Sequence, residues 1–199
     1  MEEKKAQFKT IIIPVVNEVY SDLLQQYEEV SETIQAGDDV DKITALRKDY
    51  KATNNDELLR ALKPHPQSIA IAQAAVESSW ATSRFFKEAN NVFGIWSYNK
   101  NEARIAAGEK RGDKTIWVKK YDSVEASIRD YYRTLARGDA YAEFRTLKME
   151  TNDPYELVKK LDFYSEKRGE YGEKLSKIIR FNNFVAYDQQ QVPEYPTIR

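Results

Sequence analysis

The chain has 199 residues, of which 41% are hydrophobic and 32% charged, enough for one sizeable core. Its 31 basic and 32 acidic residues nearly cancel, so no global field attracts nucleic acid or an anionic membrane. The lack of cysteine excludes disulfides and thiolate chemistry, and the single histidine, His65, argues against a multi-histidine metal site. We therefore expect no metal and no cofactor, and any catalysis must rest on carboxylates, tyrosines and backbone groups.

The first fifty residues are predicted to be helical. Apolar residues recur at steps of three and four between residues 8 and 30, which predicts an amphipathic helix. Pro14 lies inside this pattern and predicts a kink or a break near residue 13. A second helix is expected from about Asp39 to Tyr50. The longest apolar run near the start, "IIIPVV", is too short for a membrane span.

The middle of the chain changes from helix to strand. "TNNDELLRALKP" predicts a short helix with an asparagine cap that ends before Pro64. Pro66 suits the first turn of a central helix that is rich in alanine and serine and carries Glu77. Further on, "RIAA" and "TIWVKKY" are typical of two short strands joined by a glycine-containing loop. This hairpin is the only sheet that the sequence predicts.

Helix returns in the last third of the chain. "YDSVEASIRDYYRTLAR" predicts an amphipathic helix in which Asp122 and Glu125 resemble a capping box. "NDPYELVKKL" predicts a helix capped by Asp153, and a last helix is expected around residues 171–179. The tail "QQQVPEYPTIR" is polar and rich in proline, and we expect it to be extended and loosely held. The whole is predicted to be mainly helical with one inserted hairpin.

Glu77 is the first candidate for chemistry. Gln73 lies four residues before it and Trp80 three after, which predicts that all three share one helix face. An indole beside a carboxyl group excludes water, raises the pKa of the acid and keeps it protonated near neutrality. The competing interpretation is an ordinary solvated helix glutamate, and the local pattern leaves both open.

The segment "NNVFGIW" is the second candidate. Gly94 suits a backbone conformation closed to other residues, or a close approach of the backbone to a ligand. Phe93 and Trp96 would then form a wall for a flat ligand. A tight turn with two core aromatics is the alternative, and it is favoured when the segment is taken alone.

Taken together, these segments resemble a known family. "AQAAVESSWATSRFFKEANNVFGIW" is similar to the core motif of the peptidoglycan-cleaving N-acetylglucosaminidases of glycoside hydrolase family 73, and within it to the Bax-type proteins of Gram-negative bacteria. "KTIWVKKYDSVEASIRDYYRTLARGDAYAEFR", "YSEKRGEYGEKLSKII" and "KKAQFKTIIIPVV" resemble further segments of the same proteins. The resemblance covers the chain to about Asp188.

The resemblance implies an α+β, predominantly α-helical, lysozyme-like fold, with a helical lobe and a small β-hairpin lobe flanking a glycan cleft. It implies a single domain over residues 1–188, including an N-terminal helical extension over residues 1–63, followed by the polar tail 189–199. A monomer that binds the peptidoglycan glycan strand is expected. The expected location is the bacterial envelope, in the periplasm, with an export or anchor segment outside this chain.

The implied activity is that of an endo-acting β-N-acetylglucosaminidase that cleaves the bond between N-acetylglucosamine and N-acetylmuramic acid. Two alternatives stay open. One is a glycan-binding or scaffold module without efficient catalysis. The other is a muramidase or lytic transglycosylase that uses the same cleft, since this fold hosts several such chemistries.

The resemblance also implies roles for individual residues. Glu77 matches the catalytic acid, and Tyr164 matches a late tyrosine close to it, whereas Tyr171 is equally consistent with packing. The expected contacts to substrate are Trp80, Asn91, Phe93, Gly94, Trp96, Tyr98 and Tyr121.

Two departures from the family pattern matter. Many relatives carry a second glutamate in the hairpin in a Thr-x-Glu-Tyr context, and "NEARIAAGEKRGDKTIW" has no such context. Its acids are Glu102, Glu109 and Asp113, of which Glu109 is the preferred candidate for a second catalytic carboxylate. Assistance by the N-acetyl group of the substrate is the alternative.

The second departure is Ala81, which stands after the tryptophan where the family has glycine. The added methyl group is a small change unless the position requires a left-handed backbone.

Overall fold

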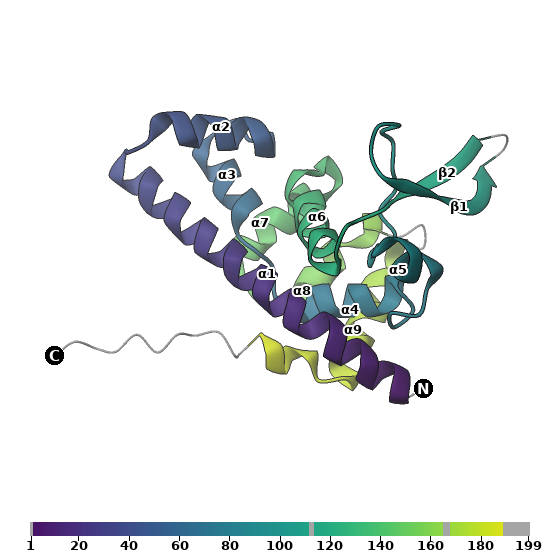
Figure 1. The fold of residues 1–199 in the computed structure, drawn as a ribbon. Helices are drawn as coiled ribbons and strands as arrows, with labels where there is room; N and C mark the ends of the chain where they lie inside the picture. The colour runs from purple at the N-terminus through teal and green to yellow at the C-terminus, as the bar shows by residue number, and fades with distance from the viewer. Residues whose placement is uncertain (1, 112–113, 165–167, 189–199) are drawn as a thin grey trace.

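The computed structural model describes residues 2–111, 114–164 and 168–188. The expected tail 189–199 and Asp113 therefore lie outside the described residues. Over the described ranges the chain is mainly helical, and its one sheet is a two-stranded antiparallel hairpin (Figure 1). The predicted α+β, predominantly helical class is confirmed.

The longest element is helix α1, Glu2–Ala36, which runs along one side of the molecule (Figure 1). The expected break at Pro14 is wrong, because the helix continues through it. Pro14 lies on the exposed side, where water can solvate the carbonyl that loses its partner, while Ile12, Ile13 and Val16 are buried around it.

Helices α2, Val40–Tyr50, and α3, Asn55–Leu62, fold back on the far end of α1. The predicted asparagine cap is present, since Asn54 accepts from the backbone N–H of Glu57 at 2.9 Å. The carboxylate of Glu57 accepts from the N–H of Thr53, the residue before the cap, at 2.7 Å, which fastens the start of the helix to the preceding segment. A small apolar cluster joins these helices and consists of Val30, Ile43, Leu58 and Leu62.

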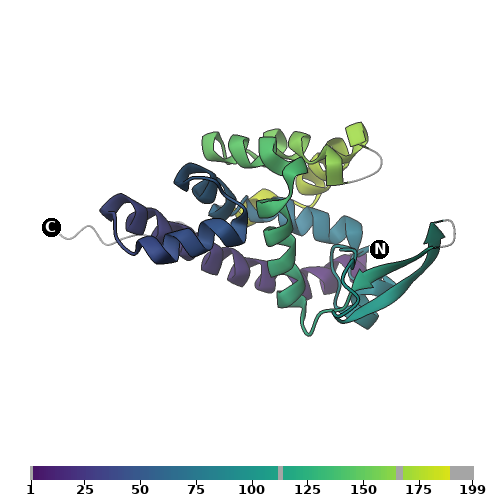
Figure 2. The ribbon, with the colours of Figure 1, turned by 90° about the horizontal axis from the view of Figure 1, so that it is seen from above.

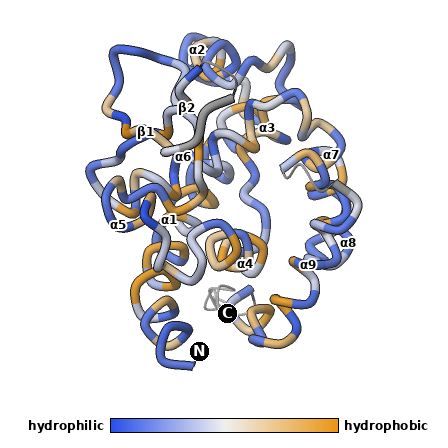
Figure 3. Tube along the Cα trace, turned by 90° about the vertical axis from the view of Figure 1, so that its right-hand side faces the viewer, coloured by the Kyte–Doolittle hydropathy of each residue, from blue (hydrophilic) through white to orange (hydrophobic). Residues whose placement is uncertain are grey.

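Helix α4, Gln67–Glu77, is the central element and is buried along almost its whole length. It packs against α1, against α9, Arg168–Phe181, and against the 3₁₀ segment η4, Phe184–Tyr187. Figure 2 shows it from above among these neighbours. Figure 3 shows hydrophobic stretches in α4 and in the part of α1 beside it. The main core lies around this helix.

Helix α6, Val124–Arg137, packs against α1 and α3. Its N-cap is Ser123 and not the expected Asp122. The hydroxyl of Ser123 accepts from the backbone N–H of Ala126 at 3.0 Å, which is the spacing that an N-cap requires.

The small lobe consists of helix α5, Arg84–Ala89, and the hairpin of β1, Arg104–Arg111, and β2, Lys114–Lys119. The register pairs Ala106 with Trp117 and becomes irregular before Lys110, around Gly108, whose φ is 87°. Trp96 forms an isolated bridge with Val118, which attaches the segment after α5 to the edge of the hairpin.

The C-terminal third alternates 3₁₀ and α segments: η1 Asp139–Tyr141, α7 Ala142–Glu150, α8 Pro154–Leu157, η2 Val158–Lys160, η3 Asp162–Tyr164, α9 Arg168–Phe181 and η4 Phe184–Tyr187. The predicted cap Asp153 accepts from the N–H of Tyr155 at 2.8 Å, but α8 is shorter than the sequence indicates. None of the helices in the described ranges combines the length and apolarity of a membrane span.

Candidate active site

Glu77 is the last residue of α4, and an unusual turn follows it. Ser79, Trp80 and Ala81 have positive φ values of 52°, 62° and 60°. The buried hydroxyl of Ser78 supports this turn, because it donates to the carbonyl of Ala74 at 2.6 Å and accepts from the N–H of Ala81 at 2.8 Å. The helix therefore ends abruptly, and Glu77 projects from a rigid, buried element.

The turn moves Trp80 off the helix face on which Glu77 lies. The indole packs edge-on against Phe8 of α1, with ring centroids 5.2 Å apart, and lies 6.5 Å from the ring of Phe184. The expectation that Trp80 shares a helix face with Glu77 and dries its carboxyl group is wrong, because three left-handed residues replace the next helical turn. Trp80 instead fastens the end of α4 to α1 and η4.

The environment of Glu77 nevertheless favours the protonated form. Burial raises the pKa of Glu77 above its ordinary value, while a hydrogen bond from Tyr171 and the charge of Lys174 act in the opposite direction. The Tyr171 hydroxyl donates to Oε1 of Glu77 at 2.8 Å. A position at the C-terminal end of a helix also disfavours a negative charge, since unpaired carbonyl groups point toward it.

Glu77 lines a cleft of about 680 Å³ whose walls are largely aromatic. Flat apolar faces with polar rims are suited to sugar rings. Among the described residues that line this cleft, Glu77 is the only carboxylate. The other lining residues are Phe85, Phe93, Gly94, Ile95, Trp96, Tyr98, Thr134, Tyr141, Phe163 and Tyr164.

Asn91 shapes the floor of the cleft without lining it. Its amide nitrogen donates to the carbonyls of Ile95 at 3.0 Å and Lys119 at 2.8 Å, and its oxygen accepts from the N–H of Ile95 at 3.0 Å. This buried side chain is therefore occupied by the backbone, rather than presented to a substrate as expected. Gly94, with φ of 66°, makes the turn that Asn91 holds.

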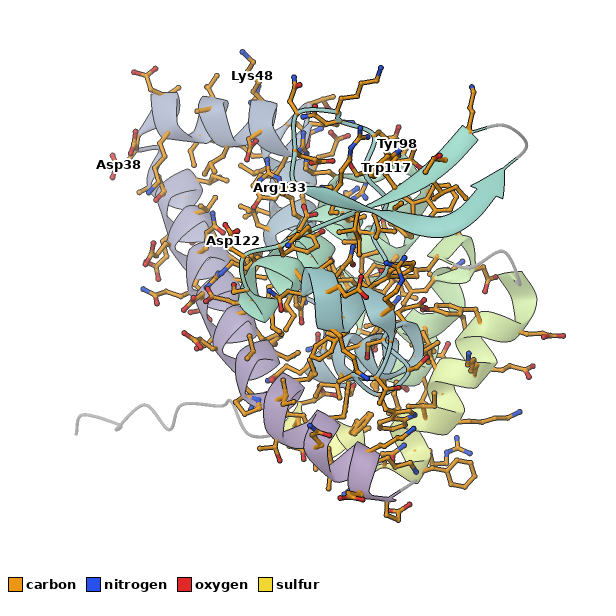
Figure 4. All side chains as sticks on the ribbon, turned by 45° about the vertical axis from the view of Figure 1, so that its right-hand side comes forward. Asp38, Lys48, Tyr98, Trp117, Asp122 and Arg133 are labelled. Carbon is orange, nitrogen blue, oxygen red and sulfur yellow. The ribbon has the colours of Figure 1, made fainter. Side chains whose placement is uncertain are left out.

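One wall of the cleft comes from the segment that follows this turn. The side chains of Trp96 and Tyr98 are 38% and 85% exposed, with ring centroids 6.3 Å apart. In Figure 4, Tyr98 and Trp117 are both labelled on the hairpin side of the molecule. Phe93 is buried and stacks on Tyr131 at 3.9 Å, so its ring belongs to the core as well as to the cleft floor. Of the two residues predicted to form an aromatic wall, Trp96 lines the cleft and Phe93 lies mostly in the core, and their contact with a ligand stays a prediction.

The opposite wall comes from η1 and η3. Tyr164 lies in the same cleft as Glu77, and its ring stacks on Tyr171 with centroids 5.9 Å apart and planes within 10°. Burial raises the pKa of Tyr164, with smaller contributions from Tyr171 and Glu77, so its hydroxyl stays protonated. Phe163, 56% exposed, and Tyr141 complete this wall.

Sequence reasoning missed Phe163 and Tyr141 as cleft residues, because short 3₁₀ segments have no helical or strand period that marks them. It also left Tyr171 open between packing and function. The "RGEYGEKL" pattern placed Tyr171 on a helix, but only the tertiary packing of α9 against α4 brings it to Glu77.

Tyr121 and Glu102, by contrast, are used within the fold. The Tyr121 hydroxyl donates to Asp130 at 2.7 Å, and Lys119 pairs with the same carboxylate at 2.8 Å, which ties β2 to α6. Glu102 accepts from the hydroxyl of Ser97 at 2.6 Å. Neither Tyr121 nor Glu102 is among the cleft-lining residues.

The preferred second acid, Glu109, lies in strand β1 just after the irregularity at Gly108, and its side chain falls outside what the structure describes. The described part of the chain also holds no cluster of three or more histidine, aspartate or glutamate side chains suited to a metal ion.

Comparison with known proteins places this chain in a family. The sequence profile described as mannosyl-glycoprotein endo-beta-N-acetylglucosaminidase matches residues 52–184. Protein bax of Escherichia coli (strain K12) is 28% identical over 131 residues, covering 63% of this chain and 46% of that protein. Exo-glucosaminidase LytG of Bacillus subtilis (strain 168) is 29% identical over 129 residues, covering 61% and 46%. The chain thus spans about half the length of these relatives.

Two solved structures share the fold. The catalytic domain of the autolysin Auto from Listeria monocytogenes matches with a TM-score of 0.52 at 23% identity, covering 83% of this chain and 88% of that chain. A peptidoglycan hydrolase from Sphingomonas sp. A1 matches with a TM-score of 0.51 at 20% identity, covering 70% and 94%. The fold is therefore the lysozyme-like one that the sequence predicts, and the chain belongs to the mannosyl-glycoprotein endo-beta-N-acetylglucosaminidase family of glycoside hydrolases.

Proposed function

We propose that this chain is a peptidoglycan hydrolase that cleaves the β-1,4 bond between N-acetylglucosamine and N-acetylmuramic acid. The observation that carries the proposal is the partly buried Glu77 at the edge of an aromatic cleft, hydrogen-bonded to Tyr171. Family membership and the names of its relatives, an exo-glucosaminidase and two cell-wall hydrolases, support the same substrate class.

In this mechanism Glu77 is the general acid. Its raised pKa increases the fraction of Glu77 that is protonated, and the proton passes to the glycosidic oxygen as the bond to the sugar C1 breaks. The exposed faces of Trp96, Tyr98 and Phe163 would hold the sugar rings on either side. Tyr164 would donate a hydrogen bond to the substrate from its protonated hydroxyl.

We infer that the substrate supplies the nucleophile. Because Glu77 is the only carboxylate among the described cleft residues, the carbonyl oxygen of the substrate's N-acetyl group would attack C1 and form an oxazoline ring. Water would then open this ring, with the ionised Glu77 accepting its proton. The rival is a conventional second carboxylate, for which Glu109 is the candidate.

Replacement of the hairpin acids separates the two mechanisms. Substrate assistance predicts that Glu109→Gln and the matched control Glu102→Gln both keep wild-type turnover of purified sacculi. A loss of about 100-fold or more in Glu109→Gln alone would assign Glu109 as the second acid.

The proposed substrate lies outside the cytoplasmic membrane, so we propose that the protein acts there, in the periplasm of a Gram-negative cell. Fractionation of cells that produce the full-length protein tests this location. Recovery in the cytoplasmic fraction alone would contradict it.

A catalytically silent glycan-binding module is the second candidate, and the lack of another carboxylate in the described cleft lining favours it. Mass spectrometry of the fragments released from sacculi discriminates all the candidates. The proposal predicts reducing-end N-acetylglucosamine. Reducing-end muramic acid indicates a muramidase, an anhydro sugar indicates a lytic transglycosylase, and binding without any soluble product indicates the glycan-binding module.

A further inference from the structure

A chain of hydrogen bonds leads from Glu77 into the core. Tyr171 donates to Oε1 of Glu77 at 2.8 Å, and Nε2 of Gln73 donates to the Tyr171 hydroxyl at 3.1 Å. Oε1 of Gln73 accepts from the hydroxyl of Tyr131 at 2.5 Å, and Nε2 of His65 lies 2.9 Å from that hydroxyl. The four inner side chains are all buried. The single histidine of the protein is thus connected to the candidate acid.

The direction of these bonds follows from the chemistry of the groups. Tyr131 has one hydroxyl proton, and the carbonyl oxygen of Gln73 can only accept it. His65 must therefore donate to Tyr131 from a protonated Nε2. Burial lowers the pKa of His65 well below its ordinary value, and nearby Lys148 adds to this, so the ring is neutral and carries one proton. Every donor consequently points toward Glu77.

We propose that His65 is a positioning residue for Glu77. By donating from Nε2, it fixes the polarity of the chain through Tyr131, Gln73 and Tyr171, so that Tyr171 always donates to Oε1 and the acid proton resides on Oε2. The inference rests on the proposed role of Glu77 as the acid.

The direction of these hydrogen bonds matters because the same side chains can also be hydrogen-bonded in the reverse direction. If the Gln73 amide rotated by half a turn, its oxygen would accept from Tyr171, which would then no longer donate to Glu77. The proton of Glu77 would be engaged on Oε1 by the Tyr171 oxygen, on the core side of the carboxyl group. In that arrangement Tyr131 would donate to Nε2 of His65, so the tautomer of the histidine selects between the two.

Other charged and titratable groups also face the two ends of the chain. Lys174 of α9 and Tyr164 of η3 interact with Glu77. Lys148 of α7 and Tyr132 of α6 face His65, and the Tyr132 ring stacks on the imidazole with centroids 4.5 Å apart. The experiment therefore leaves both lysines unchanged and uses Tyr132 as its control.

The test is the pKa of Glu77, measured from its carboxyl ¹³C resonance in the full chain and assigned with Glu77→Gln. Tyr131→Phe removes one hydroxyl from the chain and keeps the ring. Without this hydroxyl, the Gln73 amide can rotate and Tyr171 can stop donating to the Glu77 carboxylate. The pKa of Glu77 should therefore rise by about half a unit to one unit. His65→Phe should produce the same rise.

Two further variants sharpen the result. Tyr132→Phe makes the same chemical change in the adjacent tyrosine, whose buried hydroxyl has no hydrogen-bond partner among the described residues, and should leave the pKa of Glu77 unchanged. His65→Gln retains an N–H donor and should keep the pKa closer to that of the wild type than His65→Phe does.

The proposal is overturned if His65→Phe leaves the pKa of Glu77 at its wild-type value, or if Tyr131→Phe and Tyr132→Phe give Glu77 the same pKa. Activity on sacculi is a separate readout, in which the alkaline limb of the pH profile should move upward with the measured pKa. Inactivity of the wild-type protein would refute the proposed function, while the NMR result would still decide the role of His65.

Discussion

At the scale of single residues, Glu77 shows how burial by the fold raises the pKa of a carboxyl group. Burial at the end of α4 raises the pKa, and one hydrogen bond from Tyr171 partly offsets this. Glu77 has to be protonated to act as the proposed general acid, and it has to be reprotonated after each turnover.

The raised pKa of Glu77 makes the stability of the protein depend on pH. Because the pKa of Glu77 is raised in the folded state, folding is favoured most at pH values below the unfolded pKa. That advantage is lost as pH rises through the folded pKa. Glu77→Gln removes the ionisation, so we expect it to stabilise the protein by about 1 kcal/mol at pH 8 and less at pH 4.

Thermal unfolding of the wild type, Glu77→Gln and the exposed-site control Glu173→Gln at both pH values checks this expectation. An equal difference in Tm at pH 4 and pH 8, or destabilisation at pH 8, would contradict it.

Sequence reasoning grouped Glu77, Gly94 and Trp96, because they lie within one short segment whose spacing is visible, and the structure brings all three to one cleft. It could not find Phe163 and Tyr141, which reach the cleft from elements far along the chain. It also misjudged Trp80 and Asn91. Both stand at positions that suit a ligand contact. Trp80 instead packs on Phe8, which tertiary packing brings to it, and Asn91 bonds to the backbone of Ile95 across a local turn.

At the scale of elements, the turn that follows α4 is the most strained part of the site. Three successive residues with positive φ are costly for L-amino acids, at about 1–2 kcal/mol each, and hydrogen bonds of the Ser78 hydroxyl and of the turn backbone offset this cost. Helical periodicity predicted the helix but not this ending, since the pattern itself contains no stop signal other than the serines.

Ala81 is the residue at which this strain can be relieved. With φ of 60° it occupies the left-handed region that glycine adopts freely, so the departure from the family pattern is a costly one. We expect Ala81→Gly to raise the stability of the protein by about 0.5–1 kcal/mol, or about 2–3 °C in Tm.

The matched control is Ala45→Gly in the exposed face of α2, where the backbone is helical and the same change should lower stability by about 1 kcal/mol. Calorimetry of both variants provides the comparison. A loss of stability in Ala81→Gly similar to that of Ala45→Gly would show that the turn is not strained at this position.

At the scale of the whole molecule, the N-terminal helix belongs to the core that supports the site. The family profile begins at residue 52, yet Phe8, Ile12 and Val16 of α1 are buried in the same cluster as α4 and α6. Amphipathic periodicity predicted this helix and its apolar stripe. Its partner could not be predicted, because a stripe indicates that a face is buried but not against which element.

Phe8 therefore links helix α1 to the candidate active site, since it contacts Trp80 in the turn that follows α4. We expect Phe8→Ala to cost about 3–5 kcal/mol and to lower Tm by about 10 °C. Val40→Ala, at a side chain that is 68% exposed in α2, should change stability by less than about 0.5 kcal/mol. Equal melting temperatures for the two variants would contradict the placement of α1 in the main core.

The release of reducing ends from purified sacculi tests most directly whether Glu77 is the proton donor of a glycan-cleaving enzyme. We expect Glu77→Gln, folded and at least as stable as the wild type, to lose about 100-fold or more of this activity, while Glu173→Gln keeps it. Release of reducing ends by Glu77→Gln at the wild-type rate would show that Glu77 is not the proton donor.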